Sequence, residues 1–364
     1  MHPNEADSVS AGLRQHLARL IADHGGWLPF DHYMAAVLYA PGLGYYARPR
    51  PLFGADTRSG SDFVTAPELS PLFAHALAVQ LQQALGATGV DEVWEFGAGS
   101  GALAEQLLRT LEVRRYTIVE VSGALRARQC ERLAAFGERV TWADELPAEL
   151  NAVVIGNEVL DAMPVQLLAF DGARWNERGV TLHGGRLTFA DRPTDLHPPV
   201  EAGFVPGSVT EIHPQAEAFI RTLAQALQRG ATFFIDYGFP EHEYYHPQRE
   251  GGTLICHRAH TADTDVLADP GAKDISAHVN FSAIALAAQE AGAQVLGYTS
   301  QARFLLNCGL GALFDGADAR TLAPAHKLIA EHEMGELFKV IAFAPPASVF
   351  DAIGFASGDR SHRL

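Results

Sequence analysis

The stretch "VWEFGAGSGALAEQLL", residues 93–108, predicts a buried strand, a glycine-rich turn and the first turns of a helix. Three more short apolar segments follow it, "YTIVEV", "RVTW" and "NAVVIGN", and each leads into a helical or turn segment. This alternation is typical of a doubly wound, mostly parallel sheet with helices on both faces. The sequence therefore predicts an α/β fold.

The segments around this alternation divide the chain. Residues 1–88 are mostly helical and predict an N-terminal helical cap, interrupted by a loop rich in Pro and Gly. In the domain of residues 89–346, "VQLLAF" and "RWNERGVTL" predict a β-hairpin inserted at about residues 165–205. We expect the helix that starts near residue 213 to end at Gly230, because glycine commonly follows a helix C-terminus. Residues 347–364 are the predicted C-terminal tail.

Charge and cysteine content narrow the class of protein. The 364 residues include 27 Lys and Arg against 43 Asp and Glu, a formal net charge of -16, which disfavours nucleic acid or an anionic membrane as partner. The 3 cysteines are too scattered for a disulfide framework, so we expect the cytosol. No apolar run approaches the roughly 18 residues of a membrane span. The histidines between residues 242 and 260 lack a carboxylate-rich helix, so we expect no metal site.

The glycine-rich turn fits two cofactors. It contains Gly97, Gly99 and Gly101. With an alanine in the last place, this pattern matches the turn that places the pyrophosphate of a dinucleotide on a helix N-terminus, and Glu120 follows at about the 20-residue spacing of a ribose-binding acid. A similar turn holds S-adenosylmethionine, which has no phosphate but also has a ribose. These residues alone leave the choice open.

Glu95 favours S-adenosylmethionine. It lies two residues before Gly97, at the end of an otherwise apolar strand. A carboxylate beside a pyrophosphate in a low dielectric would be repelled at a cost of about 1 to 4 kcal/mol. Beside a methionine moiety, the same carboxylate attracts the α-amino group, while backbone N–H groups at the helix start bind the carboxylate of the ligand.

A second group of polar residues follows the fourth predicted strand, in "VVIGNEVLDAMPV". Asn157, Glu158 and Asp161 come after an apolar run, at the edge where open α/β sheets bind ligands. A helical turn presents Glu158 and Asp161 on one face, and a pair of acids suits a cationic acceptor better than a hydride transfer, which needs a His or Lys proton donor. Helix capping is the alternative role for this pair. Asp236 ends another strand at this edge, where a structural role in a turn is the alternative.

Together these motifs resemble the MidA-like family of S-adenosylmethionine-dependent methyltransferases, whose mitochondrial branch methylates arginine on a subunit of respiratory complex I. The likeness covers almost the whole chain, and its more specific motifs are "SDFVTAPELSPLF" (residues 61–73) and "NEVLDAMPV" (157–165). The other shared motifs are "GYY" (44–46), "EFGAGSGALA" (95–104), "VEVS" (119–122), "WNERGV" (175–180), "IDYG" (235–238), "DISAHVNF" (274–281) and "MGELFKV" (334–340).

The resemblance implies a seven-stranded class I methyltransferase sheet with an antiparallel edge hairpin, capped by the N-terminal helices. It implies that the loop of residues 41–73 closes over the cofactor or lines the acceptor channel. Thr65 and Glu68 are its expected polar contributors, with the start of a helix at Pro67 as the alternative.

The resemblance also assigns roles to individual residues. The glycines of the turn line the methionine end of S-adenosylmethionine, Glu120 binds its ribose, and "WADELP" contacts the adenine through Asp144. Asn157 joins Glu95, Thr65 and Glu68 among the predicted cofactor-binding residues.

The implied activity is methyl transfer to arginine of a protein substrate, with a respiratory-complex subunit as one class of acceptor. Arginine is cationic and delocalised, and a carboxylate pair can bind it in a forked arrangement and accept the proton that leaves. Glu158 and Asp161 are therefore the predicted catalytic residues. The chain departs from the family motif at Asn280, where Asp is usual, and lacks the double-glutamate hairpin of the larger arginine methyltransferase family.

Two other functions stay open at this point. One is a non-catalytic assembly factor that keeps the fold to bind a partner, and the other is an NAD-dependent oxidoreductase. The sequence also leaves the oligomeric state open, with a homodimer as one arrangement to test.

Overall fold

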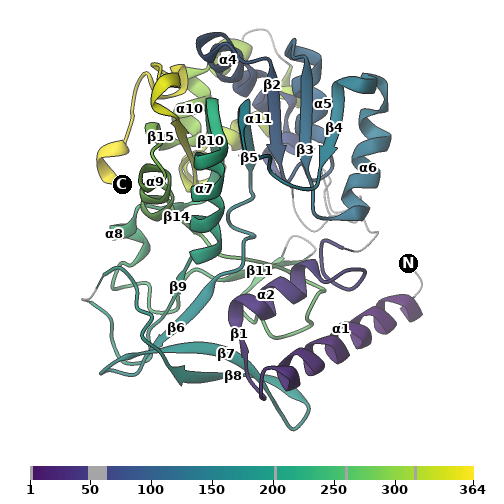
Figure 1. Ribbon diagram of the computed structural model, residues 1–364, viewed down its shortest axis with the longest axis vertical. Helices are drawn as coiled ribbons and strands as arrows, with labels where there is room; N and C mark the ends of the chain where they lie inside the picture. The colour runs from purple at the N-terminus through teal and green to yellow at the C-terminus, as the bar shows by residue number, and fades with distance from the viewer. Residues whose placement is uncertain (1–2, 48–63, 201–202, 259–260, 315–317) are drawn as a thin grey trace.

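The computed structural model describes residues 3–47, 64–200, 203–258, 261–314 and 318–364. Within them the strands form three sheets, with the largest in the upper part of Figure 1 and the second in the lower part. Residues 48–63 of the predicted active-site loop, including the start of "SDFVTAPELS", lie outside the described residues.

The large sheet contains the alternating strands predicted from the sequence. In spatial order its strands are β15 (Gln294–Ser300), β16 (Phe338–Ala344), β10 (Leu227–Phe239), β5 (Leu150–Asn157), β2 (Glu92–Phe96), β3 (Arg115–Val119) and β4 (Val140–Ala143). From β10 to β4 neighbouring strands pair in parallel, while β16 is antiparallel to both β10 and β15. A short strand, β14 (Val279–Asn280), pairs with the end of β10, so the described part of this sheet has eight strands instead of the seven predicted. Two residues are too short for a strand pattern to be visible in the sequence.

Helices cover both faces of the large sheet because its strands are apolar on both sides. Val153 and Ile155 of β5 face one core cluster, and Val154 faces the other. The first cluster includes α4 (Pro71–Thr88), α5 (Ala102–Thr110), α10 (Gln301–Asn307) and α11 (Ala319–Ile329). The second includes α7 (Pro214–Ala226) and α9 (Phe281–Glu290), and α6 (Gly123–Leu133) lies beside β4 (Figure 1). The architecture is thus the mixed α/β fold expected.

Gly230 does not end a helix. Helix α7 ends at Ala226, and Gly230 lies inside β10 with a φ of 123°. A Cβ at this position would come within 1.8 Å of the Ala152 carbonyl oxygen on β5. The predicted helix end is wrong, because the glycine allows close strand pairing instead of capping a helix.

The predicted inserted hairpin is part of a second sheet. This sheet contains β1 (Leu28–Pro29), β6 (Gln166–Phe170), β7 (Trp175–His183), β8 (Arg186–Pro193) and β9 (Val209–Ile212), paired antiparallel. Gly184 and Gly185, with φ of 57° and 80°, form the two-residue turn between β7 and β8, as a type I′ turn requires. The predicted hairpin corresponds to the β6–β7 pair. Strands β8 and β9, and β1 from the N-terminal segment, were not predicted.

The helices α1 (Pro3–Asp23) and α2 (Phe30–Tyr39) pack against the second sheet, as Figure 1 shows. Leu17 of α1 shares a core with Leu167 of β6 and Val180 of β7. A third sheet, β12 (Thr261–Asp263), β11 (Ile255–Arg258) and β13 (Asp274–Ser276), joins this core through Cys256. The division of the chain at residues 88 and 346 stays a prediction.

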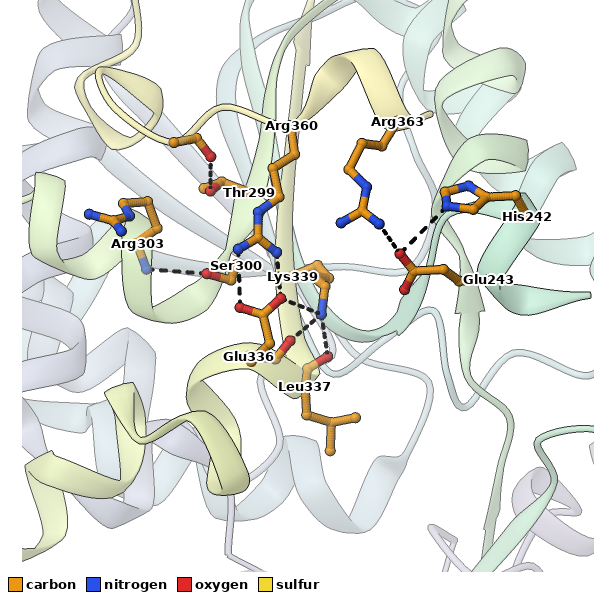
Figure 2. A network of polar contacts seen from close by, with 11 residues as sticks. His242, Glu243, Thr299, Ser300, Arg303, Glu336, Leu337, Lys339, Arg360 and Arg363 are labelled. Atoms are coloured by element: carbon orange, nitrogen blue, oxygen red, sulfur yellow. Dashed lines mark hydrogen bonds and ion pairs between the residues drawn. The ribbon is translucent and has the colours of Figure 1, made fainter. Parts of the chain in front are cut away.

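Polar contacts fasten the C-terminal segment to the large sheet (Figure 2). Arg360 pairs with Glu336, which precedes β16, and Arg363 pairs with Glu243. Lys339 of β16 donates to the carbonyl oxygen of Leu337 at 3.3 Å and so holds the start of this strand. The remaining short helices are α3 (Ala66–Leu69), α8 (Glu241–Tyr244), η2 (Ala134–Arg139), η3 (Leu310–Phe314), η4 (Glu331–Gly335), η5 (Pro346–Ser348), η6 (Ile353–Phe355) and η7 (Ser361–Arg363). No helix in the described ranges is long and apolar enough to cross a membrane.

Candidate active site

A cavity of about 800 Å³ opens at the carboxyl ends of β2, β3, β5 and β10. Open α/β sheets bind their ligands at this edge. Most of the residues predicted from the sequence line it, namely Thr65, Glu95, Gly97, Gly99, Glu120, Asn157, Glu158 and Asp161. Gly101, Glu68 and Asp144 are not among the lining residues.

The three glycines of the turn have backbone conformations that other residues rarely adopt. Their φ angles are 65° at Gly97, 53° at Gly99 and 79° at Gly101. At Gly97 a Cβ would also come within 2.9 Å of Cγ2 of Val159. Gly101 directly precedes α5, so it turns the chain into the helix and does not reach the cavity.

Glu95 is buried at the end of β2, at the cavity wall. Tyr116 of β3 donates a hydrogen bond to Glu95 Oε2 at 2.7 Å. Burial raises the pKa of Glu95 to about 8, although the hydrogen bond from Tyr116 acts to lower it. A cation bound beside this carboxyl group would favour its ionised form.

Glu120, just after β3, is held by two donors. Ser122 N–H donates to Oε1 at 2.9 Å, and Gln129 Nε2 donates to Oε2 at 3.0 Å. Gln129 is fully buried on α6, and it also donates to the carbonyl oxygen of Gly99 at 2.9 Å and accepts from Trp142 Nε1 at 3.0 Å. It therefore ties the glycine turn to Glu120. Sequence analysis missed Gln129 because a glutamine within a helix belongs to no motif.

We expect Gln129→Leu to weaken the binding of S-adenosylmethionine about 10-fold. Leucine has a similar size but leaves Glu120 and the Gly99 carbonyl without their shared donor. Isothermal titration calorimetry measures the effect, with Gln225→Leu on the exposed face of α7 as the matched control. An affinity equal to that of the control variant would contradict this role for Gln129.

Asp236 shapes the turn that presents the predicted acid pair. Its Oδ2 accepts hydrogen bonds from the backbone N–H groups of residues 159–161, at 2.9 to 3.3 Å. Glu158 has a φ of 55°, which is uncommon for a residue other than glycine and costs free energy. Asp236 thus has a structural role in a turn, and that turn fixes Glu158 in a strained backbone conformation at the cavity.

The charge of Asp161 acts on Glu158. Burial, followed by the charge of Asp161, raises the pKa of Glu158 to about 8, and burial raises the pKa of Asp161 to about 6. Tyr237 donates its hydroxyl hydrogen to Asp161 Oδ2, and Asn157 Nδ2 donates to Glu158 Oε1 at 3.2 Å. Within the described residues, Oδ1 of Asp161 and Oδ1 of Asn157 are buried without a hydrogen-bond partner. Buried unpaired acceptors on cavity-lining residues suit a ligand that brings N–H or O–H donors.

The segment of residues 64–69 forms one side of the cavity. Thr65 lines the cavity and precedes α3, whose first residue, Ala66, acts to lower the pKa of Glu158. Glu68 lies one turn further on and accepts a hydrogen bond from the hydroxyl of Ser100 in the glycine turn. Glu68 therefore fastens α3 to the turn, and its direct contact with the cofactor stays a prediction.

Asp144 lies at the surface. Its side chain is 80% exposed and forms an ion pair with Arg126 of α6 at 2.5 Å. The turn after β4 directs the carboxylate to α6, and its contact with adenine stays a prediction. Val121, an exposed apolar side chain of the cavity wall directly after Glu120, is a residue that sequence analysis missed.

Aromatic side chains form the wall beyond the acid pair. The rings of Tyr39 and Tyr46 stack with centroids 5.7 Å apart and an interplanar angle of 16°. Tyr39 donates to the carbonyl oxygen of Ala162 at 2.7 Å, and Tyr46 donates to Oδ2 of Asp274 at 2.9 Å. Sequence analysis did not select these residues, although "GYY" and "DISAHVNF" contain Tyr46 and Asp274.

The cavity wall is acidic. It carries the carboxylates of Glu95, Glu120, Glu158, Asp161 and Asp274 and, among the described residues, neither Lys nor Arg. The two wall histidines add little positive charge, because burial lowers both of their pKa values. Such a wall favours a cationic ligand. The described ranges contain no group of three His, Cys, Asp or Glu side chains placed to hold a metal ion.

Solved structures are similar to the chain over its full length. A protein from Burkholderia thailandensis, in a crystal structure bound to S-adenosyl-homocysteine, is 50% identical to this chain, with a TM-score of 0.93. The match covers 100% of this chain and 99% of that protein. A second crystal structure, of an uncharacterized protein from the same organism, is 49% identical to this chain, with a TM-score of 0.91. This match also covers 100% of this chain and 99% of that protein.

Curated proteins are similar at lower identity. "Protein arginine methyltransferase NDUFAF7, mitochondrial" from Mus musculus is 28% identical, over 94% of this chain and 86% of the relative. Its homolog from Caenorhabditis elegans is 26% identical, over 81% and 76%. A family model described as "Putative S-adenosyl-L-methionine-dependent methyltransferase" matches residues 74–299, which is more than half of the chain. The chain therefore belongs to this family of S-adenosyl-L-methionine-dependent methyltransferases.

Proposed function

We propose that the protein transfers a methyl group from S-adenosylmethionine to an arginine side chain of a protein substrate. The observation that carries this proposal is the acidic cavity wall, without Lys or Arg in its described part. Glu95 and Glu120 suit the ammonium and ribose groups of the cofactor, which leaves other wall carboxylates for a second cation. The names of the curated relatives support arginine as that cation.

The residues at the cavity fit the cofactor. The positive-φ glycine turn leaves room for close approach of a ligand to the backbone, and the unpaired Oδ1 of Asn157 suits a donor. Glu95 would bind the ammonium group, and Glu120, already oriented by Gln129, would bind the ribose hydroxyls. Val121 would pack against the adenine. When bound, S-adenosylmethionine supplies a methyl group on a sulfonium, which is open to in-line displacement.

The acid pair suits the acceptor. Methylation of a guanidino nitrogen forms an N–C bond and releases one proton from that nitrogen. Asp161, with a pKa of about 6, is ionised at neutral pH and would bind the guanidinium N–H groups. The cationic acceptor would also favour the ionised form of Glu158, and the raised pKa of Glu158 makes it the better proton acceptor of the two.

The affinity for S-adenosylhomocysteine is expected to rise with pH up to about pH 8. Glu95 is protonated below the pKa of about 8 and must lose this proton to pair with the ammonium group. The association constant therefore falls as pH drops below that value, by up to about tenfold per pH unit. Calorimetry in buffers of different ionisation enthalpy measures the proton release directly. An affinity independent of pH between about 6 and 8 would contradict the role of Glu95.

Transfer of label to protein tests the proposed function. The purified protein is incubated with tritiated S-adenosylmethionine and a lysate from cells that lack it. We expect protease-sensitive label in a protein band, and about 10²- to 10³-fold slower labelling with Glu158→Gln. Label that enters only small molecules would contradict a protein acceptor. Binding of S-adenosylhomocysteine without label in any fraction would instead favour the non-catalytic assembly factor.

The family match sets aside the NAD-dependent oxidoreductase. A cytosolic location stays a prediction, and the names of the curated relatives contain the word mitochondrial. The absence of a nucleic-acid partner, the homodimer and a respiratory-complex subunit as acceptor stay predictions as well.

A further inference from the structure

Asp274 is a cavity carboxylate outside the predicted acid pair. It lies at the start of β13, is 6% exposed and lines the cavity. Tyr46, from a segment 228 residues earlier in the chain, donates its hydroxyl hydrogen to Asp274 Oδ2 at 2.9 Å. Lys273, the preceding residue, pairs with Asp263 of β12 at 2.8 Å and does not line the cavity. The Asp274 side chain is thus part of the cavity wall.

Asp274 and Asp161 line the same cavity as the stacked tyrosines. Burial raises the pKa of Tyr39 and of Tyr46, and the charges of both acids add to this rise. The hydroxyl of Tyr39 donates to the carbonyl oxygen of Ala162, the residue after Asp161. Asp274 also acts to raise the pKa of Glu158. The carboxylates from β13 and from the turn after β5 therefore lie near the same pair of tyrosines at the cavity wall.

The same arrangement occurs twice around this region. Tyr237 donates to Asp161, and Tyr46 donates to Asp274, so each carboxylate is oriented through one oxygen by a tyrosine hydroxyl. The charge of Asp274 acts on the titratable groups of Tyr39, Tyr46, Glu158 and Cys256, and His257 and His278 line the same cavity. Both histidines are kept neutral by burial, so they do not compete for an incoming cation.

Two separate carboxylates suit a guanidinium better than an ammonium group. A guanidinium is planar, has five N–H donors on three nitrogens, and stacks on aromatic rings. An ammonium group is a compact, strongly hydrated point charge with three donors. A guanidinium can donate to two separate carboxylates while its plane lies against a tyrosine ring, whereas an ammonium group has no plane to stack.

We propose that Asp274, oriented by Tyr46, is a second acceptor-side carboxylate that makes the cavity prefer a guanidinium to an ammonium group. This inference rests on the proposed function, because it concerns the acceptor side of the same cavity. Asp274 would be a specificity-determining residue, while Glu158 and Asp161 serve the transfer itself.

Side-chain analogues test this preference without a known acceptor protein. The probes are n-propylguanidine and n-butylamine, titrated into the full-length protein saturated with S-adenosylhomocysteine and followed by ligand-observed NMR. The wild-type protein is expected to bind n-propylguanidine about tenfold more tightly than n-butylamine. Asp274→Asn is expected to remove this preference while the affinity for S-adenosylhomocysteine stays within about twofold. Asp351→Asn, an exposed position with the same loss of charge, is the control and should keep the preference.

Tyr46→Phe provides a second variant that leaves β13 and the carboxylate unchanged. It keeps the stacked ring but removes the hydroxyl that orients Asp274, so we expect about a threefold loss of n-propylguanidine affinity and little change for n-butylamine. The inference is overturned if wild type binds both probes equally, if it does not bind n-propylguanidine, or if both variants keep the wild-type preference. If the labelled acceptor contains methylarginine and one of those results is also obtained, the proposed function is kept and only the role of Asp274 is rejected. Label on another residue type would overturn the proposed function itself.

Discussion

Glu158→Gln is expected to lower kcat for methyl transfer by about 10²- to 10³-fold. Glutamine preserves the size of the side chain, and its amide oxygen still accepts the hydrogen bond from Asn157. It removes the negative charge that binds the cationic acceptor and the oxygen that takes the proton. Initial rates with tritiated S-adenosylmethionine and the labelled acceptor protein measure the loss.

The affinity for S-adenosylhomocysteine separates catalysis from binding in this variant. It is expected to change by less than about threefold, because Glu158 serves the acceptor and not the cofactor. Glu149→Gln, on an exposed position just before β5, controls for the loss of one charge. A Glu158→Gln protein with a wild-type rate and intact cofactor binding would show that another group accepts the proton.

Glu95→Gln is expected to weaken S-adenosylhomocysteine binding by about 10- to 100-fold. The carboxylate at the end of β2 is the group placed to pair with the ammonium of the cofactor, and an amide offers only a neutral hydrogen bond. Calorimetry measures the affinity, with the exposed Glu138→Gln as control. The affinity of the variant for S-adenosylhomocysteine should also lose most of its dependence on pH below about 8.

The same change is expected to stabilise the protein without its cofactor. The pKa of Glu95 is about 8 in the fold, against 4.5 for an exposed glutamate. The unfolded chain ionises above 4.5 while the folded chain stays protonated, so this carboxyl group destabilises the fold increasingly from pH 4.5 to about 8. Glu95→Gln removes that penalty, so its gain in Tm should grow over this range. A lower Tm at pH 8 would mean that the carboxylate supports the fold instead of serving a ligand.

Residues at strand ends were predictable from the sequence. Parallel strands present their carboxyl ends at one edge of the sheet, so Glu95, Glu120 and Asn157 had to come near one another once the strands were identified. The glycines were predictable for a related reason, since the turn from strand to helix needs positive φ angles. These rules depend on local sequence and on sheet topology alone.

Side-chain directions after a turn were not predictable in this way. Asp144 follows β4 as Glu120 follows β3, yet it pairs with Arg126 at the surface. Glu68 turns to Ser100, and Gln129 reaches the glycine turn from the inner face of α6. Each of these contacts depends on how separate elements pack, which no local pattern encodes.

The second sheet has more strands than were predicted, for a similar reason. Its edges come from distant segments, since β1 precedes the large sheet in the chain and β9 follows the insertion. Pairing between segments so far apart leaves no periodicity in either one. The two glycines of the β7–β8 turn were a local signal that could have extended the predicted hairpin.

The identity of the methylated residue tests the central claim most directly. The protein band labelled by tritiated S-adenosylmethionine is hydrolysed in acid, and its amino acids are separated and counted. An acidic cavity wall that binds a guanidinium predicts that the label elutes with methylated arginine. Label that elutes with methylated lysine or histidine, or that is released as volatile methanol from a hydrolysed carboxyl ester, would contradict the account.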